Sequence, residues 1–487
     1  MHKKAIRKIS FVYPPYGVVK NEPGIKVVKE NYGMFPSLSL AYVASVAEHS
    51  GRQIQFIDAN ALHLSKDQVV GRIKAFGPDL VAYTITTYLF HQTLSWIRDI
   101  KAATGIPTVV GGVHVGIYPK ETLHHEAIDY GVLCEAEEIF PKFLDALSED
   151  DDLSKVPGIV YRDPSGEIVQ TENASLFMDV DNAPFPARHH LPNEEYFSFI
   201  SKFKNFTALL TSRGCPFRCI FCEQGGLTFR PRSPGNICDE IQQCYDAYHI
   251  REFDFFDSSF TTDKKRVIKI CEEIINRKQK ILWAIRSRVD LVNEEMLKAL
   301  FEAGCRRIYY GIESGDEQIL ETLNKKVSLD TVRDVMIKTR KSGIDTFGYF
   351  MVGSPGETSE TVKKSIKLSL ELDLDYAQFS KVTPMPATRL YEMLMEEKGV
   401  DYWRDATLAG GEAPLLPRPQ CDMSDEEIQF WTRKAYLKFY FRPKYIFRAL
   451  LRIKSWHELV RSVYTAVSMF WQGNDLFAKS WTKRVQY

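Results

Sequence analysis

The sequence has no apolar run of about 18 residues, the length that a helix needs to cross a bilayer. Residues 1–17 include basic side chains but neither an apolar segment nor a small-residue cleavage site, so we expect no secretion signal. The sequence also lacks a repeat of fixed period and any low-complexity tract. These absences favour a globular protein, and we expect a cytoplasmic location.

The chain also carries no net charge, since 63 basic residues balance 63 acidic ones. The balance hides an asymmetry, because twelve Lys and Arg face two acidic residues from Arg433 onward, which leaves the preceding residues at −10. A basic tail on an acidic body indicates an anionic partner or surface. No recognised nucleic-acid-binding motif accompanies the charge, so we expect no nucleic-acid partner.

A disulfide framework is not expected, because the nine cysteines are an odd number in a long chain without an export signal. At 487 residues the chain is too long for one typical core, and two or three domains are expected. In the first part, apolar strand-like runs alternate with helical patterns. The predicted strands are 9–13, 54–58, 80–84 and 107–112, and the helices between them include 38–49 and 90–103. This alternation predicts a doubly wound α/β domain over residues 1–150.

A linker with a hairpin is predicted over 151–202, where Pro164-Ser165-Gly166 separates two alternating runs. A second series of strands then alternates with helices between residues 203 and 398. Its strands are predicted at 207–212, 252–257, 281–286, 306–312, 345–352 and 376–382. Six repeats predict a partial (β/α)6 barrel, since a full barrel has eight. Residues 399–487 are predicted to be helical.

Three cysteines, Cys215, Cys219 and Cys222, form a CxxxCxxC pattern directly after the first strand of this second series. Thiolates at this density bind zinc or an iron–sulfur cluster. Structural zinc sites use four ligands, usually from two CxxC-like pairs, and no second pair is present. A zinc loop completed by a distant ligand, or incidental buried thiols, are the alternatives. Three ligands on a four-iron cluster leave one iron free, which is a catalytic arrangement.

The cysteine loop, with the aromatic Phe221 before its last cysteine, resembles that of the radical S-adenosylmethionine superfamily. Further segments agree with this resemblance: FDFFDSSFT (253–261), GIESG (311–315), GSPGET (353–358) and PMPAT (384–388). The last segment departs from the family's PxPGT at Ala387. The resemblance covers roughly residues 203–395.

The resemblance implies that Cys215, Cys219 and Cys222 hold a [4Fe-4S] cluster whose open iron binds S-adenosylmethionine. Reduction of the cluster then releases a 5′-deoxyadenosyl radical, and the cofactors carry the difficult chemistry. Phe221 is expected beside the cluster. Glu313 suits the ribose hydroxyls of S-adenosylmethionine. Arg288 and Ser314 are expected to contact its methionine carboxylate, although Arg288 could equally be a solvent-facing residue at a strand end.

The first domain resembles the cobalamin-binding domain that precedes many radical S-adenosylmethionine barrels. The segments that carry this resemblance are YPPYG (13–17), FPSLSLAYVASV (35–46), GPDLVAYTITT (77–87) and VVGGVHVGIYPKE (109–121). The family's acidic GEGE segment is replaced by CEAE (134–137). From the resemblance we expect Gly111, Gly112 and His114 to line the corrin pocket. By itself a doubly wound sheet with a Gly-Gly loop could also bind a nucleotide, a flavin or nothing.

The predicted function is a cobalamin-dependent radical S-adenosylmethionine enzyme that modifies, and most commonly methylates, an unactivated carbon of a small-molecule or lipid substrate. An oxidative cyclase or rearrangement enzyme of the same family is the alternative. A non-catalytic cluster- or corrinoid-binding protein is the alternative from another class. A methylthiotransferase would need a second cysteine triad in the first domain, where only Cys134 is found.

The predicted partners include a reducing electron donor of flavodoxin or ferredoxin type. In the C-terminal region, Lys444, Arg448 and Arg452 recur every four residues in a predicted basic helix, which could contact an anionic membrane or an acidic substrate or cap the open end of the barrel. A further apolar stripe at helical spacing is predicted over 459–470.

Overall fold

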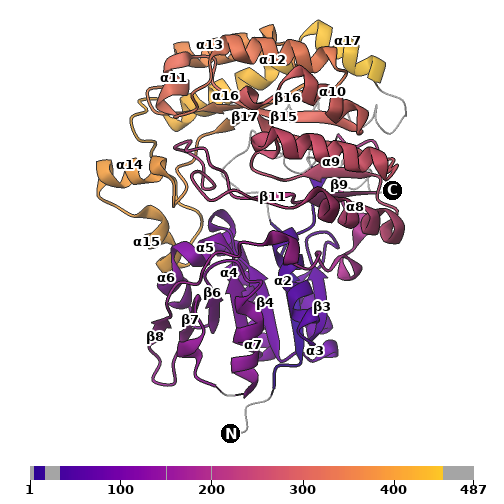
Figure 1. Cartoon of the computed structure of the whole chain (residues 1–487). Coiled ribbons are helices and arrows are strands. Elements are labelled where there is room, and N and C mark those ends of the chain that lie inside the picture. Colours follow the sequence, from indigo (N-terminus) through magenta and orange to yellow (C-terminus); the bar gives the residue numbers. More distant parts are fainter. Residues whose placement is uncertain (1–4, 17–32, 150, 199, 204, 453–487) are drawn as a thin grey trace.

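The computed structural model describes residues 5–16, 33–149, 151–198, 200–203 and 205–452. Two α/β units follow each other along the chain, and C-terminal helices pack against both (Figure 1). The stripe predicted at 459–470 lies outside the described residues. No helix within the described ranges is long and apolar enough to span a bilayer.

The first unit contains a seven-stranded sheet with helices on both faces. Its order is β3 (Gln53–Asp58), β1 (Lys8–Tyr13), β4 (Leu80–Thr84), β5 (Thr108–Gly111), β6 (Tyr130–Val132), β7 (Ile159–Arg162) and β8 (Ile168–Gln170). The first five strands are parallel, and the β7–β8 hairpin adds antiparallel strands at one edge. The predicted hairpin therefore joins this sheet.

Helices cover the two faces of this sheet because both faces of its central strands are apolar. In β4, Leu80 and Ala82 face one core, and Val81 and Tyr83 face the other. The first core includes side chains of α2 (Leu38–His49) and α7 (Ile139–Glu149); the second includes side chains of α3 (Lys66–Phe76) and α4 (Phe90–Thr104). Such burial on both sides is typical of parallel sheets. The doubly wound prediction is confirmed.

The second unit is a curved sheet of six parallel strands with helices on its outer face. Its order is β10 (Phe206–Leu209), β13 (Glu252–Phe255), β14 (Leu282–Arg288), β15 (Cys305–Glu313), β16 (Asp345–Val352) and β17 (Tyr376–Lys381). The helices that follow the strands are α8 (Pro234–Tyr248), α9 (Lys264–Asn276), α10 (Glu294–Glu302), α12 (Leu329–Lys341) and α13 (Ser359–Glu371). The predicted partial barrel of six repeats is confirmed.

The outer helices pack through narrow apolar stripes. In α9, Val267, Ile270, Cys271 and Ile274 are buried at spacings of three and four residues, so they share the face that meets the sheet. Beyond the last strand, α16 (Asp425–Tyr440) adds Ile428, Trp431 and Phe439 to the same core. This helix therefore extends the outer layer past the sixth strand.

Two shorter helices, α14 (Arg389–Lys398) and α15 (Tyr402–Ala409), connect the barrel to the first unit. The hydroxyl of Tyr118 donates to Asp401 at 2.9 Å, and a ring nitrogen of His125 lies 2.7 Å from the carbonyl oxygen of Thr407. The predicted basic helix forms α17 (Pro443–Arg452), where Lys444 and Arg448 both pair with Asp373.

Candidate active site

The cysteine loop leaves the barrel at the carboxyl end of β10 and returns to α8. Two short strands, β11 (Ser212–Arg213) and β12 (Arg230–Pro231), pair antiparallel and close the base of the loop. Figure 1 shows β11 between the two large sheets. The loop therefore begins and ends at the boundary between the two units.

Local hydrogen bonds and one glycine shape this loop. Gly214 has φ +75°, and a Cβ there would lie 2.1 Å from the carbonyl oxygen of Thr228, so only glycine fits. The N–H of Cys222 donates to the carbonyl of Cys219 at 3.2 Å. Asp257, which follows β13, accepts from the N–H of Thr211 at 2.6 Å and from the hydroxyl of Ser212 at 2.5 Å. These contacts hold the chain just before the cysteines.

The three thiols lie near one another and near two cations. Cys215 is buried, and Cys219 and Cys222 are half-buried. Burial raises the pKa of the Cys219 thiol, whereas the charges of Lys325 and Arg288 oppose this rise. Arg288 Nη1 lies 3.6 Å from Cys219 Sγ. A metal centre would complete the stabilisation of the thiolates, because thiolate ligation requires deprotonation.

The arrangement fits a cluster better than a single zinc ion. Among the residues that the structure describes, the triad is not one of the groups of three His, Cys, Asp or Glu whose ligand atoms lie within 4.8 Å of one another. Ligands of one tetrahedral ion would lie within that distance, because Zn–S bonds are about 2.3 Å long. Thiolates that each bind a different iron of a cube lie farther apart. Phe221 is half-buried in the same loop.

A buried ion pair lies beside the cysteines at the end of β15. Lys325 Nζ donates to Glu313 Oε1 at 2.8 Å, and both side chains are under 10% exposed. Glu313 adopts φ +67°, a strained conformation for a residue other than glycine. A Cβ at Gly311 would lie 2.3 Å from Glu313 Oε1 and 2.7 Å from Lys325 Nζ, so this glycine makes room for the pair.

Lys325 was not predicted from the sequence as a site residue. It follows the GIESG segment by ten residues and stands next to another lysine in a loop. The sequence around it therefore gave no sign that one of the two lysines belongs to the site. What distinguishes it is burial, since Lys325 is 5% exposed whereas Lys326 is exposed. Lysine is rarely buried without a partner or a function.

Two other predicted contacts of S-adenosylmethionine are already engaged by protein groups. Arg288 pairs with Asp290 at 2.9 Å, and its Nη2 donates to the carbonyl of Lys325 at 2.6 Å. Ser314 Oγ lies 3.3 Å from Ser365 Oγ and accepts from the N–H of Asp316 at 3.2 Å. Arg288 thus connects the cysteine loop to the loop that contains Lys325. The side chain of Ser314 faces α13 instead.

The predicted corrin-contacting residues lie at the carboxyl end of β5. Gly111 ends this strand, and Gly112 follows with φ +103°. A Cβ at Gly112 would lie 2.6 Å from the carbonyl oxygen of Ile85, so no larger residue fits there. His114 is fully buried, stacks on Phe90 with ring centroids 4.4 Å apart, and lies 3.5 Å from Thr407 Oγ1. Burial lowers the pKa of His114 to about 3, so the ring is neutral.

A ligand at this edge would meet unsatisfied polar atoms. The Nδ1 atom of His114 and the hydroxyl of Thr87, which follows β4, are both buried without a hydrogen-bond partner among the described residues. Buried polar groups normally have partners, and ligands of doubly wound sheets bind beyond the carboxyl ends of the strands. The edge therefore fits a bound group.

Acidic residues of the first unit hold both ends of the cysteine loop. These residues belong to the CEAE segment. Glu135 accepts from Arg230 at 2.5 and 2.8 Å and lies 3.3 Å from Arg213, which also pairs with Glu137. Arg213 and Arg230 occupy β11 and β12 at the base of the loop. The segment therefore links the first unit directly to the cysteine site.

Comparisons with known proteins agree with this arrangement. Residues 209–369 match the family model of the radical SAM superfamily, and residues 25–144 match that of the B12 binding domain. An uncharacterised methyltransferase of Pyrococcus horikoshii is 34% identical over 91% of this chain and 94% of its own length. The anaerobic magnesium-protoporphyrin IX monomethyl ester cyclase of Rubrivivax gelatinosus is 30% identical over 80% of this chain and 70% of its own length.

A solved structure shares the fold of both units. The radical S-adenosylmethionine methyltransferase TsrM from Kitasatospora setae, with cobalamin and a [4Fe-4S] cluster bound, aligns with a TM-score of 0.66. The alignment covers 80% of this chain and 78% of that one, at 20% sequence identity. The chain therefore belongs to the radical S-adenosylmethionine superfamily of enzymes, among the members that carry a B12 binding domain ahead of the barrel.

Proposed function

We propose that this chain is a cobalamin-dependent radical S-adenosylmethionine methyltransferase that acts on an unactivated carbon. The observation that carries the proposal is the cysteine triad, held on one loop beside the buried Glu313–Lys325 pair and tied to the B12 binding domain by Glu135. Similarity to a methyltransferase over nearly the whole chain supports the reaction class. The substrate proposed is a small molecule or a lipid.

In this proposal Cys215, Cys219 and Cys222 each bind one iron of a [4Fe-4S] cluster, and the fourth iron stays open for S-adenosylmethionine. When bound, the cofactors supply the 5′-deoxyadenosyl radical and the methyl group. The protein orients these groups and excludes water. Arg288 and Lys325 add positive charge next to the thiolates, which favours their deprotonated form.

The remaining site residues position S-adenosylmethionine and the corrin. Glu313 offers carboxylate oxygens to ribose hydroxyls, with Phe221 and Ser314 nearby in the proposed pocket. In this proposal Lys325 also contacts the methionine carboxylate, because its buried ammonium lies near the Cys219 thiol and is the charge that a carboxylate needs. Gly111 and Gly112 let the corrin approach the end of β5, and the unpartnered Nδ1 of the neutral His114 is available to it.

An oxidative cyclase is the second candidate function, supported by the 30% identity to the Rubrivivax enzyme. The two reactions differ in their products. A methyltransferase yields S-adenosylhomocysteine and 5′-deoxyadenosine together with a methylated product. A cyclase yields 5′-deoxyadenosine without S-adenosylhomocysteine. Incubation of reduced enzyme with S-adenosylmethionine and candidate substrates, followed by mass spectrometry, separates them.

The cluster assignment is tested by serine substitution at each of the three cysteines after anaerobic reconstitution. Each variant is expected to lose the cluster's visible absorption and electron paramagnetic resonance signal and to form no 5′-deoxyadenosine. Cys421→Ser is the matched control, because Cys421 is also half-buried but lies outside the loop. Retention of the cluster signal in the three variants would contradict the proposal, as would a zinc-only wild type.

We propose that the reducing electron comes from a donor of flavodoxin or ferredoxin type that docks at the cysteine loop. Pro216 and Arg218 are exposed between the proposed cluster ligands, and Arg218 suits an acidic donor surface. The variant Arg218→Glu is expected to slow turnover with the donor protein but not with dithionite. Equal slowing with both reductants would count against docking at this place.

We propose a peripheral membrane contact through α17. Phe447 is 65% exposed and Ile446 42% exposed, whereas the nearby Lys444 and Arg448 pair with Asp373. Sedimentation with vesicles that contain phosphatidylglycerol is expected to retain the enzyme, and Phe447→Ser is expected to weaken this retention. Phe430→Ser is the control, because Phe430 is 56% exposed on the neighbouring α16.

A further inference from the structure

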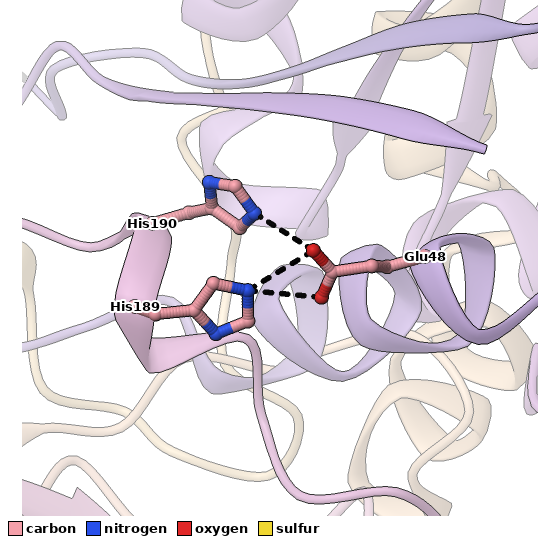
Figure 2. A group of neighbouring side chains, drawn as sticks. All are labelled: Glu48, His189 and His190. Atoms are coloured by element: carbon pink, nitrogen blue, oxygen red, sulfur yellow. Dashed lines mark hydrogen bonds and ion pairs between the residues drawn. The ribbon is translucent and has the colours of Figure 1, made fainter. Parts of the chain in front are cut away.

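Three potential metal ligands, Glu48, His189 and His190, lie close together outside the cysteine loop. His189 Nε2 lies 2.9 Å from Glu48 Oε2, and His190 Nε2 lies 3.1 Å from Glu48 Oε1. Figure 2 shows both imidazoles extending from one turn of the chain towards the carboxylate on α2. Burial alone would raise the pKa of Glu48, but the two imidazoles lower it below its ordinary value.

The chemistry and spacing of this group suit a divalent transition-metal ion. Two histidines and one glutamate form a common zinc ligand set, with a fourth position left for water. Zn–N and Zn–O bonds of about 2.0–2.2 Å place tetrahedral ligand atoms about 3.4 Å apart, so the observed contacts would widen by only a few tenths of an ångström. Among the described residues, this is the group of three whose ligand atoms all lie within 4.8 Å of one another.

The group lies where the linker meets the first unit, so an ion bound there would connect the two. His189 and His190 belong to η4 (Arg188–His190), a single turn in the linker. Arg188, the first residue of that turn, is buried on the barrel side, where it donates to Glu240 at 2.8 Å and to the carbonyl of Ala208 at 2.9 Å. The same turn therefore contacts the barrel through one residue and the first unit through the next two.

We propose that Glu48, His189 and His190 bind a divalent transition-metal ion, of which Zn²⁺ is the probe, and that this ion links α2 of the first unit to the linker turn that anchors in the barrel. The site is separate from the cluster ligands and uses none of them. The three side chains are partly exposed, Glu48 to 36%, His189 to 51% and His190 to 27%. An ion can therefore reach them from solvent. The ion replaces a hydrogen-bonded contact by coordinate bonds across the boundary.

The test measures zinc retention by enzyme that was purified without a histidine tag and reconstituted with its cluster, so that the cysteines are occupied. One equivalent of Zn²⁺ is added, unbound metal is removed by gel filtration, and zinc and iron are measured together. Wild type is expected to retain about one zinc per chain in addition to its iron. Glu48→Gln and His190→Gln are expected to bind zinc at least tenfold more weakly, since even the loss of an outer-shell partner costs 10–100-fold.

His49→Gln is the matched control. His49 is exposed, neighbours Glu48 on α2 and contacts the carbonyl of Ser45 at 2.8 Å instead of the proposed site. This control should retain zinc as wild type does, and all four proteins should keep the same iron content, which shows that the variants fold. Zinc should also raise the unfolding temperature of wild type but not of Glu48→Gln, because a ligand stabilises the state that binds it. Wild type that retains no zinc, or variants that retain as much, would overturn the proposal.

Discussion

The carboxylate of Glu135 in the B12 binding domain accepts two hydrogen bonds from the guanidinium of Arg230 in the barrel, at 2.5 and 2.8 Å. Arg230 lies at the end of the cysteine loop, and Arg213 at its start lies 3.3 Å from the same carboxylate. Burial would raise the pKa of Glu135, but the two arginines lower it. Together with Glu137, which also pairs with Arg213, this side chain holds the cysteine loop against the B12 binding domain.

Replacement of Glu135 by Gln is therefore expected to destabilise the boundary between the units. The amide keeps the shape but removes the charge and one of the two acceptors, so Arg213 and Arg230 lose their shared partner. We expect a loss of about 1–3 kcal/mol in the free energy of unfolding. Urea unfolding of the reconstituted enzyme under anaerobic conditions measures this loss.

The exposed Glu138, three residues further on, provides the control. Glu138→Gln should unfold at the same urea concentration as wild type. A double variant with Arg230→Gln should lose less than the sum of the two single losses, because the residues share one interaction. Additive losses would mean that Glu135 and Arg230 act independently.

Replacement of Lys325 by Met is expected to weaken S-adenosylmethionine binding by tenfold or more. A charge-assisted hydrogen bond contributes about 1.5–3 kcal/mol, and the variant also leaves Glu313 as an unpaired buried charge. Isothermal titration of the reconstituted, unreduced enzyme measures binding without turnover. The adjacent, exposed Lys326 offers the control Lys326→Met, which should bind as wild type does.

The two effects of the Lys325 substitution are separable. In the double variant Lys325→Met with Glu313→Gln, no buried charge is left unpaired, so protein stability should recover. If Lys325 contacts the methionine carboxylate, this double variant should bind S-adenosylmethionine more weakly than Glu313→Gln alone, which already lacks the proposed ribose contact. Equal binding by the double variant and by Glu313→Gln would instead show that Lys325 serves only to neutralise Glu313.

Local sequence patterns were sufficient to predict the parts of the molecule that are built from neighbouring residues. The strand-helix alternation predicted both sheets, because parallel strands buried on two faces are apolar throughout. The spacing of Cys215, Cys219 and Cys222 placed them on one loop. The roles predicted for Arg288, Ser314 and His114 stay predictions.

Contacts between distant residues left no such pattern. Glu135 and Arg230 are 95 positions apart, and Glu48 and His190 are 142 apart. Charged residues such as these are most often solvated, so composition alone gives no reason to pair them. Lys325 was missed for the same reason, because its burial accompanies a contact with Glu313, twelve residues away on another element.

Replacement of Gly112 by Ala is expected to remove cobalamin while leaving the cluster in place. The residue has φ +103°, and an added Cβ would lie 2.6 Å from the carbonyl oxygen of Ile85, so the loop after β5 must move. The ratio of corrin absorption to iron content measures the effect. Gly71→Ala in α3 is the control, since nothing lies within 4 Å of its Cβ. An unchanged ratio in Gly112→Ala would place the corrin elsewhere.

The carboxyl of Glu357, in the loop after β16, is expected to make stability depend on pH. Burial raises its pKa from 4.5 to about 7, although the N–H groups of Gly353 and Ser354 donate to it at 2.5 and 3.0 Å.

The folded state therefore binds the proton of this carboxyl more tightly than the unfolded state does. The stabilisation that results is full below about pH 4.5 and is lost as the pH rises to 7. Relative to Glu357→Gln, wild type should therefore lose about 2.5 kcal/mol of unfolding free energy between pH 5 and 8. Urea unfolding at both pH values measures this difference, and Glu360→Gln, which removes an exposed carboxylate nearby, should lose as much as wild type. Parallel pH profiles for wild type and Glu357→Gln would mean that Glu357 has the same pKa folded and unfolded.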